Sequence, residues 1–314
     1  MATGWKDWLR LVKSMNCTIC GSPAVISLKH DGSRLCREHF ISYFESKVKG
    51  TILSGGMIAE KERVAVAVSG GKDSTALLFC LYRILSGREV ELVALTLDEG
   101  IAGYRDDTIQ AAKDIARRLG VEHQIISFQE EYGQSLDRMV VGRHVAPCTY
   151  CGVFRKHALN RAARTLGADK IATGHNLDDE AQTVMMNYLK GDMERLMRLR
   201  PRRAQNGLVP RIKPLRAVPE KEIALYCMLN DVFFLSRECP YAGLSLRAEI
   251  RDMMNVLEGQ FPGSKLSTVK GFEGLIESLP FSWPQMDLAA CRQCGEPCVG
   301  ERCKACHLLE EIET

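Results

Sequence analysis

Val64-Ala65-Val66-Ala67-Val68-Ser69-Gly70-Gly71-Lys72-Asp73-Ser74 is an apolar run that breaks abruptly into small and polar residues. The chain then becomes apolar again, which predicts a buried strand, a tight turn and a helix. Two adjacent glycines allow positive φ angles and a close approach of the backbone to a ligand. Amide N–H groups at the start of the predicted helix can then converge on an anion.

Lys72 adds a mobile cation to this turn, and Ser69 and Ser74 add hydroxyl donors. The pattern differs from the G-x-x-x-x-G-K-S/T loop, because only two glycines precede the lysine and an aspartate follows it. A Gly-Gly turn after a strand is usually structural, but these six ordered residues resemble the PP-loop of ATP pyrophosphatases. The resemblance implies that ATP is cleaved between its α- and β-phosphates, that a substrate oxygen is adenylated, and that the loop holds the departing pyrophosphate.

Strand-like and helix-like segments alternate through the middle of the chain. We expect strands at 63–68, 91–97, 122–127 and 170–173, and helices at 74–85, 105–119 and 154–166. This alternation predicts an α/β fold with a doubly wound parallel sheet. Ligands of such sheets bind beyond the carboxyl ends of the strands. The phosphate loop, 96–100 and 173–180 lie at three such ends, so we expect them to face one crevice.

Composition indicates an ordinary globular protein of about two structural units, with 314 residues of which 46% are apolar and 26% charged. A net charge of +3 is too small to indicate nucleic-acid binding by itself. No apolar run approaches the roughly 20 residues that span a bilayer. The first eight residues also lack the apolar region of a signal peptide. We therefore expect a cytoplasmic protein with no membrane partner.

Most of the thirteen cysteines are spaced like metal ligands rather than like disulfide partners. Two sets of paired ligands have the spacing of tetrahedral structural zinc sites, so we expect two Zn2+ ions. These sets are Cys17, Cys20, Cys36 and His39 near one end, and Cys291, Cys294, Cys303 and Cys306 near the other. Cys298 and His307 are alternative ligands of the second set. Cys80 and Cys227 lie on apolar stretches and are expected in the core.

Four regions follow from these motifs. We expect an N-terminal zinc-binding module with its linker at 1–55 and an ATP-binding catalytic domain at 56–240. A helical extension with a break at Pro262-Gly263 is expected at 241–285, and a C-terminal zinc-binding module at 286–314.

Gly174-His175-Asn176-Leu177-Asp178-Asp179-Glu180 opens a predicted helix. Acidic residues in a first helical turn ordinarily complement the helix dipole. Opposite a phosphate loop they can also hold Mg2+, which ATP chemistry requires. Asp179 can in addition orient or deprotonate a nucleophile. His175 either contacts a phosphate or is packed against its neighbours.

Cys148 and Cys151 form a C-x2-C pair with no second pair nearby. By itself such a pair fits a redox dithiol, half of a zinc site, or two ligands of an iron–sulfur cluster. Cys239, which follows an expected strand at 232–235 and precedes Pro240, is either a third thiol of the same site or a core residue. Three thiolates would leave one iron of a four-iron cluster free to bind sulfide.

A run of cations without any acidic residue lies between positions 195 and 216. It suits a phosphate backbone, and its prolines and glycines argue against an amphipathic membrane helix. Its members are Arg195, Arg198, Arg200, Arg202, Arg203, Arg211, Lys213 and Arg216.

The order of these motifs along nearly the whole chain resembles the tRNA 2-thiouridine synthetases of the TtuA and NcsA group. Related cytidine thiolases and lysidine synthetases share the loop but lack both zinc modules. The resemblance implies ATP-dependent 2-thiolation of a tRNA uridine, with sulfur delivered through a [4Fe-4S] cluster. It also implies a ubiquitin-like sulfur carrier that ends in a thiocarboxylate, and a homodimer.

The same resemblance implies roles for individual residues. Cys148, Cys151 and Cys239 would ligate the cluster and act in catalysis together with Lys72 and Asp179. Other positions would bind ATP. These are the loop residues Ser69, Gly70, Gly71, Lys72, Asp73 and Ser74, the backbone near Ala67 and Leu97 around the adenine, and Arg155, Gly174, His175 and Asp179. Lys156 is an alternative to Arg155, and tRNA would meet Arg198, Arg200, Arg202, Arg203 and Arg211.

Several alternatives stay open at the level of sequence. The Glu-Cys-Pro-Tyr-Ala segment around Cys239 favours the T-loop 5-methyluridine as target, and the anticodon wobble uridine is the alternative. A persulfide on Cys148 or Cys151 could replace direct sulfide transfer. A lysidine-type ligase without sulfur chemistry and a non-catalytic, zinc-stabilised RNA-binding protein are the competing functions.

Overall fold

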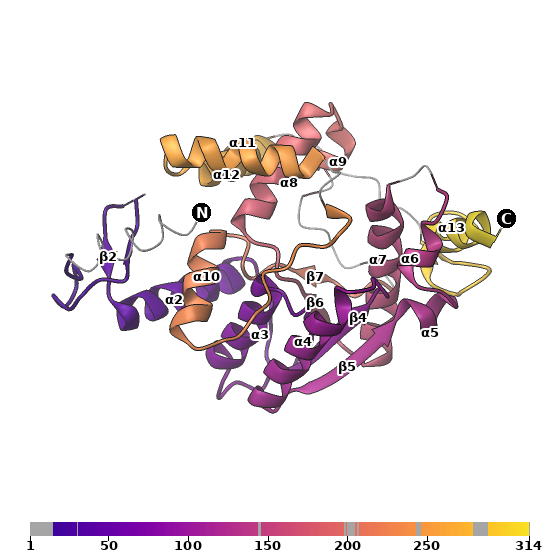
Figure 1. The fold of residues 1–314 in the computed structure, drawn as a ribbon, viewed down its shortest axis with the longest axis horizontal. Helices are drawn as coiled ribbons and strands as arrows, with labels where there is room; N and C mark the ends of the chain where they lie inside the picture. The colour runs from indigo at the N-terminus through magenta and orange to yellow at the C-terminus, as the bar shows by residue number, and fades with distance from the viewer. Residues whose placement is uncertain are drawn as a thin grey trace.

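A five-stranded parallel sheet forms the centre of the protein in a computed structural model, which describes residues 15–29, 31–143, 146–197, 199, 205, 207–242, 246–278 and 288–313. The strand order is β5-β4-β3-β6-β7 (Figure 1). The strands are β3 (Arg63–Ala67), β4 (Glu91–Asp98), β5 (Glu122–Ser127), β6 (Lys170–Ala172) and β7 (Arg211–Ile212). The predicted α/β class and parallel sheet are confirmed.

Helices cover both faces of this sheet, as expected for a doubly wound fold. Because successive side chains of a strand point to opposite faces, Val64 and Val66 pack with one layer and Leu95 and Leu97 with the other. The first layer comprises α2 (Arg37–Ser54), α3 (Lys72–Ile84), α4 (Arg105–Leu119) and α10 (Glu220–Leu229). The second comprises α5 (Phe128–Tyr132), α6 (Leu136–Met139) and α7 (Pro147–Thr165).

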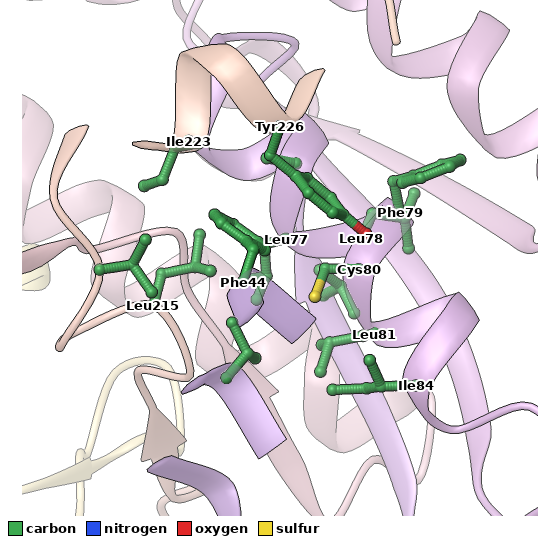
Figure 2. Close-up of a cluster of buried hydrophobic side chains, with 14 of the residues drawn as sticks. Phe44, Leu77, Leu78, Phe79, Cys80, Leu81, Ile84, Leu215, Ile223 and Tyr226 are labelled. Carbon is green, nitrogen blue, oxygen red and sulfur yellow. The ribbon is translucent and has the colours of Figure 1, made fainter. Parts of the chain in front are cut away.

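The first layer contains a densely packed aromatic centre (Figure 2). The rings of Phe44 and Tyr226 stack with centroids 4.0 Å apart and an interplanar angle of 8°. Cys80 and Cys227 are fully buried in the same cluster, as the sequence predicted. Burial raises the pKa of Cys227 to about 12, so this thiol stays protonated at neutral pH and serves as a core residue.

Two expected elements differ from the structure, and one further strand was not expected. The helix expected at 154–166 begins at Pro147, because proline is well suited to a first helical position. The segment 232–235 is not a strand, and Leu235 alone forms an isolated parallel bridge, with Gly71. Strand β7 was missed because only two of its residues pair with β6.

Further helices and two small modules surround the central layers. Helix α8 (Leu177–Leu189) is followed by α9 (Met193–Met197) and lies beneath α11 (Leu246–Gln260) and α12 (Ser264–Ser278) in Figure 1. One module contains β1 (Ile26–Ser27) and β2 (Arg34–Leu35). The other contains β8 (Ala289–Ala290), β9 (Pro297–Cys298) and α13 (Lys304–Glu313), which contacts α7. None of the described helices is long and apolar enough to cross a bilayer.

Candidate nucleotide and thiol site

The turn between β3 and α3 has the shape of an anion-binding loop. Gly70 has a φ angle of 81°, and a Cβ there would lie 1.8 Å from the carbonyl oxygen of Thr108, so only glycine fits. Gly71 has a φ angle of −81° and is the N-cap of α3, so only one of the two glycines uses a positive φ. The Ser69 amide donates to Ser74 Oγ at 3.0 Å, which fixes the turn around the open end of α3.

Lys72, the first residue of α3, is held by two carboxylates. Its Nζ lies 2.7 Å from Asp73 Oδ1 and 3.2 Å from Glu220 Oε1. Burial disfavours the charged amine, but these carboxylates outweigh burial and raise the pKa of Lys72. Lys72 therefore stays cationic beside the loop, and an incoming phosphate would compete with the two carboxylates for it.

Two other segments lie directly against this loop. A Cβ on Gly174, just beyond β6, would lie 2.9 Å from the Ser74 nitrogen, so this position also requires glycine. The Leu235 amide donates to the Gly70 carbonyl oxygen at 3.4 Å, which brings the chain leading to Cys239 beside the loop. Leu97 at the end of β4 is buried, and its carbonyl oxygen accepts a hydrogen bond from Arg105. The expected strand ends therefore meet at one edge of the sheet.

Helix α8 begins with a capping box that includes Asp179. The Asn176 amide donates to Asp179 Oδ2 at 3.1 Å, and the Asp179 amide donates to Asn176 Oδ1 at 3.0 Å. Burial raises the pKa of Asp179 despite the Asn176 amide and the nearby Arg247. Asp178 is instead bound by the Lys265 ammonium and the Glu220 amide. Of this pair, Asp179 is the carboxylate available to a ligand.

His175 carries a neutral imidazole at neutral pH. Desolvation by the surrounding protein, with the nearby cation of Lys213, lowers the pKa of His175 to about 4. Its Nδ1 lies 2.9 Å from Thr173 Oγ1. Because part of the residue remains accessible to solvent, its neutral imidazole can contact a ligand by hydrogen bonding but not as a cation.

The structure brings the three candidate thiols together. Cys148 and Cys151 occupy the first turn of α7, and Cys239 lies in the loop that follows Leu235. Besides burial, the neighbouring Cys148 raises the pKa of Cys239, and Cys239 raises the pKa of Cys151, so Cys239 lies near both other thiols. Burial raises the pKa of Cys151 to about 11, although the Arg155 guanidinium, 3.2 Å from the sulfur, opposes this shift.

The spacing of the three sulfurs differs from that of a single-ion site. A tetrahedral zinc ion with Zn–S bonds of about 2.3 Å requires sulfurs about 3.8 Å apart. Among the described residues, two four-residue sets place their ligand atoms within 4.8 Å of one another, and the three thiols form no such set. Cys151 and Cys239 pack against the same hydrophobic cluster, and three thiols outside a compact single-ion set are compatible with a group of several iron atoms.

A buried carboxylate, to which the sequence assigned no role, connects the thiols to the loop. Glu99 Oε1 lies 2.8 Å from Arg155 Nη2, and Glu99 Oε2 lies 2.8 Å from Arg105 Nε. Arg105 Nη1 in turn donates to the Ser69 carbonyl oxygen at 3.1 Å. The only signal in the sequence was the position of Glu99 just after a strand.

The two compact sets are the predicted metal ligands at the ends of the chain. One set is Cys17, Cys20, Cys36 and His39, and the other is Cys291, Cys294, Cys303 and Cys306. In the second set the Sγ atoms of Cys291 and Cys306 lie 3.8 Å apart, and those of Cys294 and Cys303 lie 3.6 Å apart. Cys298 and His307 belong to neither set.

Acidic residues from other elements form ion pairs with some of the cations between positions 195 and 216. Lys213 Nζ lies 2.6 Å from Glu180, and Arg216 Nη2 lies 2.5 Å from Glu273. Arg211 is exposed and donates to the Lys156 carbonyl oxygen. The other predicted tRNA contacts, Arg198, Arg200, Arg202 and Arg203, lie outside the described residues.

The parallel sheet and its Ser-Gly-Gly-Lys-Asp-Ser turn define a PP-loop protein, and residues 41–257 match the family described as PP-loop domain. Residues 16–41 match the N-terminal LIM domain of the 2-thiouridine synthetase TtuA. The tRNA 2-thiolation protein NcsA of Haloferax volcanii is 38% identical, over 95% of this chain and 99% of the relative. The chain therefore belongs to the PP-loop family of tRNA 2-thiolation proteins, which confirms the resemblance seen in the sequence.

Two further relatives support this assignment. The cytoplasmic tRNA 2-thiolation protein 1 of Drosophila melanogaster is 40% identical, over 93% of this chain and 86% of the relative. A solved structure of the U34-tRNA thiolase NcsA from Methanococcus maripaludis with its [4Fe-4S] cluster superposes with a TM-score of 0.83 at 36% identity. It covers 95% of this chain and 96% of that protein.

Proposed function

We propose that this protein is a cytoplasmic, ATP-dependent tRNA-uridine 2-sulfurtransferase that forms AMP and pyrophosphate. The observation that carries the proposal is the three-thiol site, linked through Arg155 and Glu99 to a phosphate loop with a charged Lys72. A lysidine-type ligase would need no such thiols. The names of the Drosophila and Haloferax relatives support both the tRNA substrate and the cytoplasmic location.

The first step activates the base. The C2 oxygen of the uridine attacks the α-phosphorus of ATP, and the bond to the bridging oxygen breaks to release pyrophosphate. The loop from Ser69 to Ser74 holds the phosphates, and Lys72 stabilises the negative charge of the leaving group. Asp73 and Asp179 would hold the Mg2+ that accompanies ATP and neutralises part of its charge.

The second step replaces oxygen by sulfur. A sulfide nucleophile adds to C2, the bond from C2 to the adenylated oxygen breaks, and AMP leaves. Cys148, Cys151 and Cys239 would hold a [4Fe-4S] cluster, which when bound supplies an iron without a protein ligand as a site for sulfide. The Arg155 cation beside Cys151 stabilises negative charge on sulfur. A ubiquitin-like thiocarboxylate carrier would deliver the sulfur at the sulfide oxidation level. The alternative route, a persulfide on Cys148 or Cys151, would require a persulfide donor in place of this carrier.

The two compact ligand sets would each hold a structural Zn2+ ion. Sulfur separations of 3.6 and 3.8 Å in the second set match the tetrahedral value of about 3.8 Å. The proposal includes an N-terminal zinc-binding module with its linker at 1–55, a catalytic domain at 56–240, a helical extension at 241–285 and a C-terminal zinc-binding module at 286–314. It also includes a homodimeric state.

The target base is proposed to be the anticodon wobble uridine. Similarity to the U34-tRNA thiolase of Methanococcus maripaludis supports this position. The T-loop 5-methyluridine, favoured by the residues around Cys239, is the alternative. In either case the base must leave its stack to reach the crevice.

The decisive test uses anaerobically purified protein mixed with tRNA and ATP. We expect AMP and pyrophosphate in equal amounts, together with iron and acid-labile sulfide bound to the protein. Cys239→Ala should lose iron and thiolation, whereas Cys298→Ala, a thiol outside all three sites, should keep both. Full thiolation and iron content in Cys239→Ala would refute the three-thiol site, and AMP formation by an iron-free protein would favour the ligase.

A further inference from the structure

Four side chains form a continuous path between the phosphate loop and the thiol site. Arg105 donates to the carbonyl oxygens of Ser69 and Leu97, both at the edge of the sheet where the phosphate loop lies. Glu99 bridges Arg105 to Arg155, with one carboxylate oxygen 2.8 Å from each guanidinium. The same Nη2 atom of Arg155 lies 3.2 Å from the sulfur of Cys151.

Burial differs along this path in a way that assigns the central role to Glu99. The Glu99 side chain is 6% exposed and that of Arg105 is 4% exposed, so both are fixed parts of the core. The Arg155 side chain is 52% exposed, and a long side chain of this kind keeps many rotamers open unless a partner holds it. Glu99 is the rigid partner that limits Arg155 to the conformation beside Cys151.

Charge balance supports the same assignment. A buried carboxylate is stable only when it is paired, and Glu99 is paired with two guanidinium groups. One anion between two cations leaves a net positive charge, and Arg155 places its share of that charge 3.2 Å from the Cys151 sulfur. The three residues thus present a localised positive charge to the thiol site while remaining anchored to the loop.

We propose that Glu99 is a positioning residue that fixes Arg155 against the thiol site and joins this site to the ATP loop through Arg105. This proposal rests on the sulfurtransferase function, because it assigns to Glu99 the alignment of Arg155 with the sulfur. Arg105 retains its bonds to two backbone carbonyls without Glu99, so loss of the carboxylate affects the Arg155 side of the path.

The test is a double-mutant cycle with Glu99→Gln, Arg155→Met and the double variant. Each single variant should lower the kcat of thiolation by about 100-fold, the typical cost of a misplaced catalytic group. The KM for tRNA and the ATP Kd of the cluster-free protein should stay within about 3-fold of wild type. The double variant should be no slower than the slower single variant.

A measurement without turnover accompanies the cycle. The electron paramagnetic resonance spectrum of the reduced, reconstituted cluster should change in the same way in both single variants and in the double variant. Glu222→Gln is the matched control, because Glu222 is a buried carboxylate paired with Lys47 at 3.2 Å in another part of the core. This control should retain the wild-type spectrum and kcat.

The outcomes separate this proposal from the proposed function. If the loss of kcat in the double variant equals the product of the two single losses, the role of Glu99 is overturned. A wild-type spectrum in Glu99→Gln would overturn it as well. If the wild-type protein forms neither AMP nor thiolated tRNA, the sulfurtransferase function fails. The spectra still show whether Glu99 acts on the thiol site through Arg155. If Glu99→Gln does not fold, Glu99→Asp keeps the charge but is one methylene too short. A wild-type spectrum and kcat in that variant would likewise overturn the proposal.

Discussion

Lys72 of the phosphate loop and Glu220 at the start of α10 form an ion pair with a separation of 3.2 Å. The same ammonium contacts Asp73, so two carboxylates already pair with the cation to which a phosphate would bind. Glu220 is 44% exposed, and a pair of this kind contributes only about 0.2–1 kcal/mol. An ATP phosphate can therefore displace it at small cost.

Removal of this competitor should strengthen ATP binding. We expect Glu220→Gln to lower the ATP Kd by up to about 5-fold in calorimetry of the cluster-free protein. Lys72→Ala should abolish AMP formation while zinc and iron contents stay unchanged. Glu222→Gln, in the same helix but paired with Lys47, should leave the Kd as it is. Weaker ATP binding in Glu220→Gln would show that Glu220 supports the nucleotide instead.

The buried pair of Lys265 and Asp178 should be a major anchor for the helices that cover α8. Lys265→Met leaves the Asp178 carboxylate buried beside a single backbone donor, the Glu220 amide. The expected loss is about 3–5 kcal/mol in the free energy of unfolding, measured by urea denaturation. The double variant Lys265→Met with Asp178→Asn should recover much of this loss. A loss as large in the double variant as in Lys265→Met would contradict the pairing argument.

The ligand geometry at the C-terminal module predicts metal content. Cys303→Ser should reduce zinc from two ions to one per chain, since Cys303 lies 3.6 Å from Cys294 within the compact set. Cys298→Ser should keep both ions, because Cys298 Sγ contacts the Gly300 carbonyl oxygen instead. Elemental analysis of the two purified variants makes the comparison. Equal zinc contents in both would mean that the ligands are assigned incorrectly.

His175 should make the protein less stable in mild acid. Because its pKa in the folded state is lowered to about 4, the unfolded chain takes up a proton near pH 6.5 while the folded protein does not. The stabilising effect of neutral His175 is thus present above about pH 6.5 and is lost as the pH falls toward 4. When the pH is lowered from about 7.5 to about 5, the Tm of His175→Gln should therefore fall less than the Tm of the wild type. An equal Tm difference at both pH values would count against the lowered pKa.

The sheet and the location of the site could be predicted from the sequence because their signals are local. Alternating apolar strands and helices, the Ser69–Ser74 loop and the paired zinc ligands each occupy a short segment. The sequence predicts a start of α7 that is later than the observed one, because the C-x2-C pair in its first turn carries no periodic apolar pattern. The segment at 232–235 was expected to be a strand from its apolar content, which instead packs Val232 into the core.

The connections within the site depend on long-range contacts that no local pattern reveals. Glu99 and Arg155 are 56 positions apart in sequence and meet only because the N-terminal half of α7 packs beside the end of β4. Lys213 and Arg216 looked like free cations until the fold placed Glu180 beside both. Charge counted along a sequence cannot show acidic partners that other elements supply.

The proposed function requires that this protein converts a tRNA uridine to 2-thiouridine with consumption of ATP. The most direct measurement is anaerobic incubation of reconstituted protein with tRNA, ATP and sulfide, followed by nuclease digestion and mass spectrometry of the nucleosides. We predict one 2-thiouridine and one AMP per turnover, mapped to the wobble position, and neither product in Lys72→Ala. AMP formation without any thiolated nucleoside, or thiolation that continues in the absence of ATP, would contradict the proposed sulfurtransferase function.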